Sequence, residues 1–374
     1  MQIQAFETEH FYAEYEFAAP HLLSASDCEA ISVQELMQMA GMSLEDLGAL
    51  KLGYTESQGD PALRQAIAAT YQGVSADDVV VLATPIEGIY LTMRALLGSE
   101  DEAVVLSPAY DALSNLPSHI SSNVRRWQLT PTTSGWRLDF SALYELLSDK
   151  TKLVVVNFPH NPTGFLPTPD EFKELTERVQ QCGAWLFCDE MYRGLEFGEH
   201  SQLQSATELY ERSVVLSGLS KTYGLPGLRC GWLVIRNAAL LDELMNWKMY
   251  TSICAPGPVE FLAQAALRAS EQIISRNIAI IRDNLALAKP FFARWSHLFT
   301  WRPPLAGSVA LVESTQGATT DYCHAVAKQA GVVLLPSAFL GGSDKFIRFG
   351  FGRKNFSESL QAFEAYLQSS DTAN

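Results

Sequence analysis

Short runs of β-branched and aliphatic residues recur through the middle of the chain, each bounded by small or polar residues. Runs of about four to eight such residues are typical of strands that are buried on both faces. We therefore predict six strands: VVVLA (79–83), AVVLS (103–107), KLVVVNF (152–158), AWLFCDE (184–190), SVVLS (213–217) and GWLVI (231–235).

Helical periodicity occupies several of the segments between these runs. The clearest examples are PALRQAIAATY (61–71), DFSALYELLSD (139–149) and PDEFKELTERVQQCG (169–183). The last of these opens with a proline and closes with a glycine, as helices often do. Strands that alternate with helices indicate an α/β fold whose mostly parallel, doubly wound sheet is joined by crossover helices.

The C-terminal third has a different pattern. Residues 258–295 show nearly continuous helical periodicity, which predicts one long helix leading out of the sheet. The short strand-like runs ALVES, GVVLLPS and FIRFGFG follow, separated by helical stretches. We expect an N-terminal arm that forms part of a small domain (1–40), a large domain (41–280) and a small α+β C-terminal domain (281–374).

Composition favours a globular cytoplasmic enzyme. The 374 residues are 47% hydrophobic, and the start MQIQAFETEH has no basic cluster of a secretory or transit signal. No apolar run is long enough to span a bilayer. The six cysteines lack CxxC spacing and are expected to be reduced, and the seven histidines show no metal-binding pattern. The net charge of −15 disfavours a nucleic-acid partner and permits a cationic small substrate.

Candidate chemistry follows the predicted strands at their ends, where α/β sheets bind ligands. Lys221 lies just after the run 213–217, and Arg229 follows eight residues later. A desolvated lysine beside another cation has a lowered pKa and acts as an amine nucleophile that forms Schiff bases. The alternative is an ordinary exposed loop lysine. A phosphate-binding P-loop is excluded because Ser220, rather than glycine, precedes Lys221.

Two further strand ends carry polar side chains. Asn161 lies in NFPHNPTG (157–164), which read alone is also compatible with a plain proline-rich turn. Asp189 and Tyr192 follow the run AWLFC. A carboxylate that leaves a buried strand requires a cationic partner, such as a protonated ring nitrogen.

Four motifs together resemble the class I/II aminotransferases, which are fold-type I pyridoxal-phosphate (PLP) enzymes. They are NFPHNPTG at 157, DEMY at 189, SKTYGLPGLR at 220 and IRFG at 347, in the family's order and spacing. The resemblance implies PLP as the cofactor, an L-α-amino acid as substrate, and a PLP-binding large domain with a smaller α+β domain.

The resemblance also implies roles for individual residues. Lys221 would hold PLP as a Schiff base and move the substrate proton, while Asp189 would keep the pyridine nitrogen protonated. The other expected cofactor contacts are Arg229 on the phosphate, Asn161 and Tyr192 on the phenolic oxygen, and Tyr110 on the ring face. Arg348 would bind the substrate α-carboxylate through its planar fork, with an inter-strand ion pair as the alternative.

Tyr54 matches a tyrosine that reaches the phosphate of the partner subunit in this family. The match implies a homodimer with shared active sites, and the loop around Tyr250 is a second segment that is expected to cross.

The chain departs from the family pattern at the phosphate site. ATPIEG stands where a glycine–small–hydroxyl turn is common, and Gly218 stands where a hydroxyl is frequent. We expect phosphate contacts from Thr84 and Ile86 in that turn and from Ser217 and Ser220 beside the lysine.

The reaction type stays open between two alternatives. The family default is transamination between an L-α-amino acid and a 2-oxo acid, through Schiff-base and quinonoid intermediates. The subgroup that these motifs most resemble also contains capreomycidine synthase, which cyclises a hydroxylated arginine by elimination. A guanidinium substrate requires acidic partners, and we expect Glu9 and Asp27 in the acidic N-terminal segment to supply them, unless that segment is merely a solvated face. A non-catalytic PLP-binding sensor is a remote third alternative, because no basic helix-turn-helix precedes Tyr54.

Overall fold

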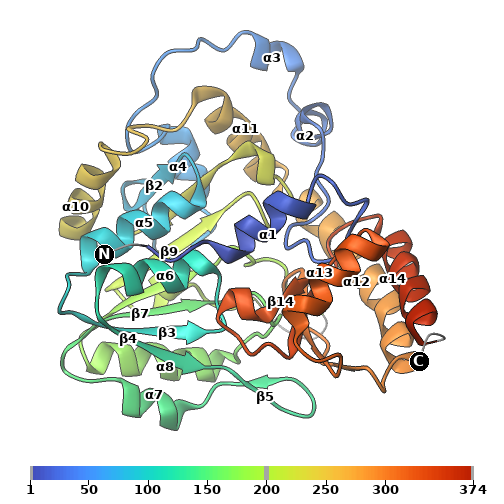
Figure 1. The fold of residues 1–374 in the computed structure, drawn as a ribbon. Coiled ribbons are helices and arrows are strands. Elements are labelled where there is room, and N and C mark those ends of the chain that lie inside the picture. The colour runs from blue at the N-terminus through green and yellow to red at the C-terminus, as the bar shows by residue number, and fades with distance from the viewer. Residues whose placement is uncertain (1–2, 198–201, 372–374) are drawn as a thin grey trace.

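A seven-stranded sheet forms the centre of the large domain in the computed structural model, which describes residues 3–197 and 202–371. Figure 1 shows this fold. The strand order is β2-β10-β9-β8-β7-β3-β4, and every neighbouring pair is parallel except the two that involve β10. The strands are β2 (Val79–Leu82), β3 (Glu102–Ser107), β4 (Asn123–Gln128), β7 (Thr151–Asn157), β8 (Trp185–Asp189), β9 (Ser213–Gly218) and β10 (Gly231–Val234). All six predicted strands are confirmed. The edge strand β4 was not predicted, because NVRRWQ is largely polar and only Trp127 within it is buried.

Helices cover both faces of this sheet, which confirms the doubly wound class. Alternate strand residues point to opposite faces, so that Val79 and Val81 join one core cluster while Val80 and Leu82 join the other. The first cluster packs against α4 (Pro61–Ala68), α7 (Phe140–Leu146), α8 (Pro169–Gln181) and α11 (Gly257–Arg268). The second packs against α5 (Pro85–Leu96), α6 (Asp111–Ile120) and α10 (Ala238–Lys248). The remaining short elements of this part are α3 (Leu44–Gly48), β5 (Thr130–Pro131), β6 (Trp136–Arg137) and α9 (Ala206–Leu209).

The prediction of one long helix over 258–295 is wrong. The segment forms α11 and then α12 (Ser270–Arg294), with a break at Ala269. The break allows α11 to pack on the large sheet while α12 crosses from Ile273, in the large-domain core, to Phe291, in the second core. Periodicity misses the break because neither glycine nor proline marks it.

A four-stranded antiparallel sheet with the order β11-β12-β15-β14 forms the second domain. Its strands are β11 (Phe299–Trp301), β12 (Val309–Ser314), β14 (Leu335–Pro336) and β15 (Phe346–Gly350), and α12, α13 (Thr319–Ala330) and α14 (Phe356–Asp371) pack beside it. The N-terminal segment joins this domain, because β1 (His21–Leu22) pairs with β13 (Val332–Val333). The helix α2 (Val33–Met39) contributes Leu36 and Met37 to the large-domain core instead, and the expected domain boundaries stay a prediction.

The acidic N-terminal segment contains a helix, α1 (Glu7–Tyr15), which lies between the large sheet and the second domain (Figure 1). Phe11 and Tyr15 on one side of α1 are buried in the core of the second domain. Glu9, Tyr12 and Glu16 follow at spacings of three and four residues, which places them on a shared face.

The two departures from the family pattern contact each other. Gly218 and Gly231 are cross-strand partners in β9 and β10, and Pro85 at the start of α5 packs against both. A Cβ at Gly218 would lie 2.8 Å from the Cys230 carbonyl oxygen and 3.1 Å from Pro85 Cγ. A hydroxyl side chain at 218 is therefore incompatible with this packing.

No helix within the described part of the chain has the length and apolar character needed to cross a membrane.

Candidate active site

A pocket of about 380 Å³ opens where the large sheet, α1 and the second domain meet. Twelve of the residues expected from the sequence line it: Glu9, Asp27, Thr84, Ile86, Tyr110, Asn161, Asp189, Tyr192, Ser220, Lys221, Arg229 and Arg348. Two do not. Ser217 is buried beside the pocket and its hydroxyl lies 3.5 Å from the Glu190 carbonyl oxygen, while Tyr54 is 94% exposed on the surface.

The Lys221 side chain points into this pocket, and its Nζ donates to Ser26 Oγ at 2.8 Å. Removal of the ammonium group from water lowers the pKa of Lys221, partly opposed by the negative charge of Asp27. A lowered pKa raises the fraction of neutral amine, which is the form that attacks an aldehyde.

Asp189 ends β8 as a buried carboxyl group. Met191 N donates to its Oδ1 at 3.0 Å, and burial raises the pKa of Asp189 to about 7. Lys221 lowers that pKa only in part. A cation placed against this carboxyl group would favour its charged form, so the site suits a protonated ring nitrogen.

Asn157 holds the ends of two strands together. Its Nδ2 donates to the Asp189 carbonyl oxygen at 2.8 Å, and its Oδ1 accepts from Asn161 N at 2.7 Å. The Asn161 Oδ1 in turn accepts from Arg348 at 3.1 Å, which leaves the Asn161 amide hydrogens as donors. The buried Tyr192 hydroxyl lines the same pocket and has no hydrogen-bond partner among the described residues.

Arg348 is a buried guanidinium, only 2% exposed, whose contacts are all neutral. It donates to the Ser24 carbonyl oxygen, to Asn161 Oδ1 and, at 2.7 Å, to the Tyr12 hydroxyl. Within residues 3–197 and 202–371 it makes no ion pair, so the inter-strand ion pair considered from the sequence is not formed. A buried cation without a counter-ion is unfavourable and calls for an anionic ligand.

Arg229 lies at the opposite side of the pocket, beside the start of α5. Its backbone is left-handed, with φ 54° and ψ 55°, a conformation that costs a non-glycine residue about 1–2 kcal/mol. The strained turn directs the guanidinium to Thr84 Oγ1, to which it donates at 2.6 Å. An arginine beside a helix N-terminus is a favourable environment for a phosphate group.

These residues fit PLP on each of its polar groups. Asp189 suits the ring nitrogen, Arg229 and the α5 N-terminus suit the phosphate, and the unpartnered Tyr192 hydroxyl with the Asn161 amide suits the phenolic oxygen. Lys221 supplies the amine that attaches the aldehyde.

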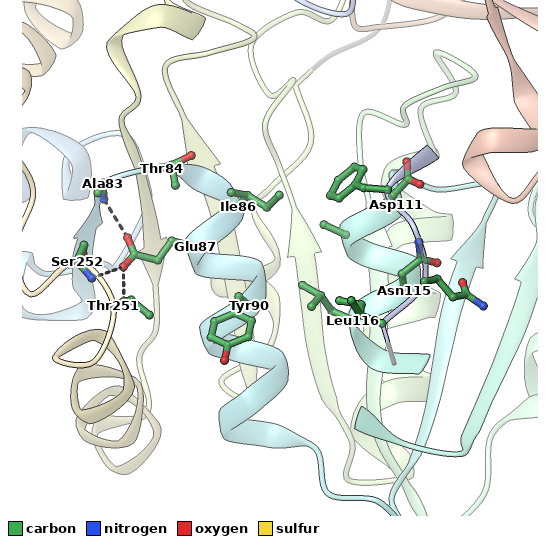
Figure 2. A pocket seen from close by; sticks show the side chains of 14 residues that line it. Ala83, Thr84, Ile86, Glu87, Tyr90, Asp111, Asn115, Leu116, Thr251 and Ser252 are labelled. Carbon is green, nitrogen blue, oxygen red and sulfur yellow. Dashed lines mark hydrogen bonds between the residues drawn. The ribbon is translucent and has the colours of Figure 1, made fainter. Parts of the chain in front are cut away.

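A second cavity, of about 530 Å³, adjoins the first and shares Thr84 and Ile86 with it (Figure 2). It lies between α5 and α6 and is lined mainly by apolar groups, including Phe6. Glu87 at its edge accepts from Ala83 N, Thr251 Oγ1 and Ser252 N (Figure 2). These bonds attach the loop after α10 to the start of α5.

Several polar residues of α1 and the segment after it line the pocket and were not singled out from the sequence. Tyr12 contacts Arg348, Ser26 contacts Lys221, and Glu16 lines the wall, while Ser24 outside the lining contacts Arg348 through its carbonyl oxygen. The signal that was available is the helical spacing of Glu9, Tyr12 and Glu16 within the acidic segment.

Comparison with known proteins decides the family. The model for aminotransferase class I and II matches residues 29–356. The chain belongs to the class I and II aminotransferases. It is therefore a PLP-dependent enzyme, as the sequence motifs implied.

Individual proteins resemble this aminotransferase over most of its length. Capreomycidine synthase from Streptomyces vinaceus is 31% identical over 92% of this chain and 88% of its own. A PLP-dependent aminotransferase from Streptococcus suis superimposes with a TM-score of 0.92 at 27% identity, covering 99% of both chains. The PLP-dependent cyclase OrfR superimposes with a TM-score of 0.91 at 29% identity, covering 99% of this chain and 98% of its own.

Asp189 predicts a pH-dependent stability for this aminotransferase prepared without PLP. Its pKa is about 7 in the fold and about 4 in an unfolded chain, so between these values the folded state keeps a proton that the unfolded state has lost. Stability therefore falls as pH rises through this window, by on the order of 2 to 4 kcal/mol. Thermal unfolding from about pH 5 to about pH 8 measures the fall, which Asp189→Asn reduces.

Glu190 is a second buried acid that could cause the same pH dependence, because burial also raises its pKa to about 7. An equal fall in Asp189→Asn and in the parent would assign the effect to Glu190 or other groups and contradict the prediction.

Proposed function

We propose that this enzyme binds an L-α-amino acid through Arg348 and transfers its amino group to a 2-oxo acid. The observation that carries the proposal is the buried Arg348 guanidinium, which lacks a carboxylate partner and lines the same pocket as Lys221 and Asp189. An α-carboxylate matches its planar fork. PLP, when bound, withdraws electrons from the substrate Cα and so makes its proton acidic.

Different residues of the chain transfer the proton, stabilise the cofactor ring and bind its phosphate. Lys221 Nζ takes the proton from the substrate Cα and returns it, and its lowered pKa provides the neutral base that this step needs. Asp189 stabilises positive charge on the cofactor ring, and Arg229 and Thr84 anchor the phosphate. Ser220, Ile86 and Tyr110 complete the expected cofactor contacts, with Ser217 behind them.

Elimination with cyclisation is the second candidate reaction. The similarity to capreomycidine synthase and to the cyclase OrfR over nearly the whole chain supports it. Both reactions begin with loss of the proton at Cα, so Lys221, Asp189 and Arg348 serve either one. The two differ in what happens to the amino group, which stays on the product in elimination and is left on the cofactor in transamination.

A single-turnover experiment separates the two reactions. PLP-loaded enzyme is mixed with an amino acid in the absence of any 2-oxo acid, and the visible absorbance and the products are followed. The proposal predicts stoichiometric formation of an oxo acid and of the amine form of the cofactor. A cyclic product from hydroxylated arginine, with the original spectrum restored, would instead establish the cyclase. Lys221→Ala serves as the control, in which neither product forms.

We also propose that two copies of the chain form a homodimer with shared active sites. Leu52 and Tyr54 are 83% and 94% exposed, and Tyr250 is 88% exposed. Thr55 Oγ1 donates to the Ala255 carbonyl oxygen at 2.7 Å, so the two loops that carry these side chains lie together. Exposed apolar residues gathered in this way favour a subunit contact. The six free cysteines fit a reducing, cytoplasmic location.

Mixed dimers test the shared site. Tyr54→Ala and Lys221→Ala are each expected to have little activity. If Tyr54 acts on the partner's cofactor, unfolding and refolding the two variants together gives mixed dimers in which one site has both native residues. Random pairing then restores about a quarter of the parent activity. The account is contradicted if sedimentation shows a monomer, or if mixing restores no activity while mixed dimers form.

A further inference from the structure

We propose that the substrate carries a cationic group at the far end of its side chain and that Glu16, on the α1 face of the pocket, is the residue that recognises it. The proposal rests on the proposed function, because it takes Arg348 as the site of the α-carboxylate. It names a class of substrate, the amino acids that end in a guanidinium or an ammonium group.

The charges that line the pocket leave an acidic remainder. Bound PLP would take up Lys221 in the Schiff base and would pair with Arg229 through its phosphate and with Asp189 through its ring nitrogen, and a substrate α-carboxylate would pair with Arg348. The acids that remain on the lining are Glu9, Glu16 and Asp27.

Asp27 already has a cationic partner within the protein. Its Oδ2 accepts from Arg353 at 2.7 Å, in an ion pair that is mostly buried. The expectation that Asp27 meets a substrate guanidinium stays a prediction, and Arg353 is the cation that pairs with Asp27 in the structure. Glu9 is exposed, and its carboxylate accepts from the Tyr110 hydroxyl at 3.2 Å.

Glu16 differs from both of these acids. It is half-buried at the end of α1, and no ion pair or side-chain hydrogen bond satisfies its carboxylate within the described residues. Burial raises the pKa of Glu16, and the negative charges of Asp27 and Glu9 raise it further, which the positive charges of Arg353 and Lys221 offset only in part. A cation bound among these groups would relieve that repulsion.

Two other side chains of the same pocket indicate that it is built to hold polar ligands. The Tyr192 hydroxyl and the Arg348 guanidinium are both more than nine-tenths buried and lack, respectively, any hydrogen-bond partner and any carboxylate partner among the described residues. Tyr12 on α1 contacts Arg348, because its hydroxyl accepts a hydrogen bond from the guanidinium at 2.7 Å. Glu16 lies one helical turn beyond Tyr12, and a turn advances about 5.4 Å.

This axial rise between Tyr12 and Glu16 is the basis on which we infer the length of the substrate side chain. A chain of about three or four methylene groups covers one helical turn. An amino acid held by Arg348 at its carboxylate therefore presents the head group of an arginine- or lysine-length side chain to Glu16. Aspartate-like and glutamate-like substrates would meet repulsion at the same place.

Binding to charged and neutral analogues tests the substrate class. PLP-loaded Lys221→Ala enzyme, which binds amino acids without turnover, is titrated by calorimetry with arginine and citrulline, and with lysine and norleucine. The cationic member of at least one pair is expected to bind about tenfold more tightly, as a charged hydrogen bond provides. The pair that shows the difference tells guanidinium from ammonium, and equal affinities in both pairs overturn the proposal.

A second substitution assigns the effect to Glu16. Glu16→Gln in the same background should weaken binding of the preferred cationic analogue about tenfold and leave its neutral counterpart unchanged. Glu16→Asp should keep part of the preference. Glu7→Gln is the matched control, because it removes an acid from the same helix outside the pocket and should change neither affinity.

The remaining outcomes overturn the assignment. Equal weakening of both analogues by Glu16→Gln would mean that Glu16 only supports the structure, and loss of the preference in Glu9→Gln alone would move the role to Glu9. If neutral amino acids alter the visible absorbance of the enzyme and cationic ones do not, this inference fails while the proposed function stands. If no amino acid alters it, the proposed function fails as well.

Discussion

The buried carboxyl group of Asp189 at the end of β8 requires a positively charged partner if it is to be ionised at neutral pH. Asp189 accepts one backbone hydrogen bond and is otherwise removed from water, so that burial alone favours its neutral form. A cation placed against it favours the charged form at neutral pH. The parallel strands β7, β8 and β9 end at the same edge of the sheet, which brings Asn157, Asp189 and Lys221 together. This edge is therefore where a cationic partner for Asp189 would bind.

The α1 helix completes the pocket by serving two domains at once. Its apolar side, with Phe11 and Tyr15, is part of the core of the second domain, while its polar side faces the sheet edge. Tyr12 contacts Arg348 on β15, which links the helix to the proposed carboxylate site. The segment therefore forms one wall of the active-site pocket and brings acids to where a substrate side chain would extend.

How much the sequence could predict depended on whether a feature is local. The six buried strands and the residues at their ends were predictable, because apolar runs and the motifs that follow them are continuous in sequence. The polar edge strand β4 and the break at Ala269 were not, since packing rather than composition determines both. In the sequence, Gly218 indicates only that a hydroxyl contact to the phosphate is missing. The fold shows that Pro85 and the neighbouring strand leave no room for a side chain at this position. The proposed role of Glu16 depends on the ion pair between Asp27 and Arg353, which are 326 residues apart.

The protonation of the cofactor ring tests the central claim most directly. Enzyme loaded with PLP that carries ¹⁵N in the ring is measured by NMR at neutral pH, and Asp189→Asn enzyme is measured as the comparison. If Asp189 is the charged partner of the cofactor, the ¹⁵N shift is that of a protonated pyridine in the parent and that of a neutral one in the variant. A neutral ring nitrogen in the parent enzyme would contradict the account.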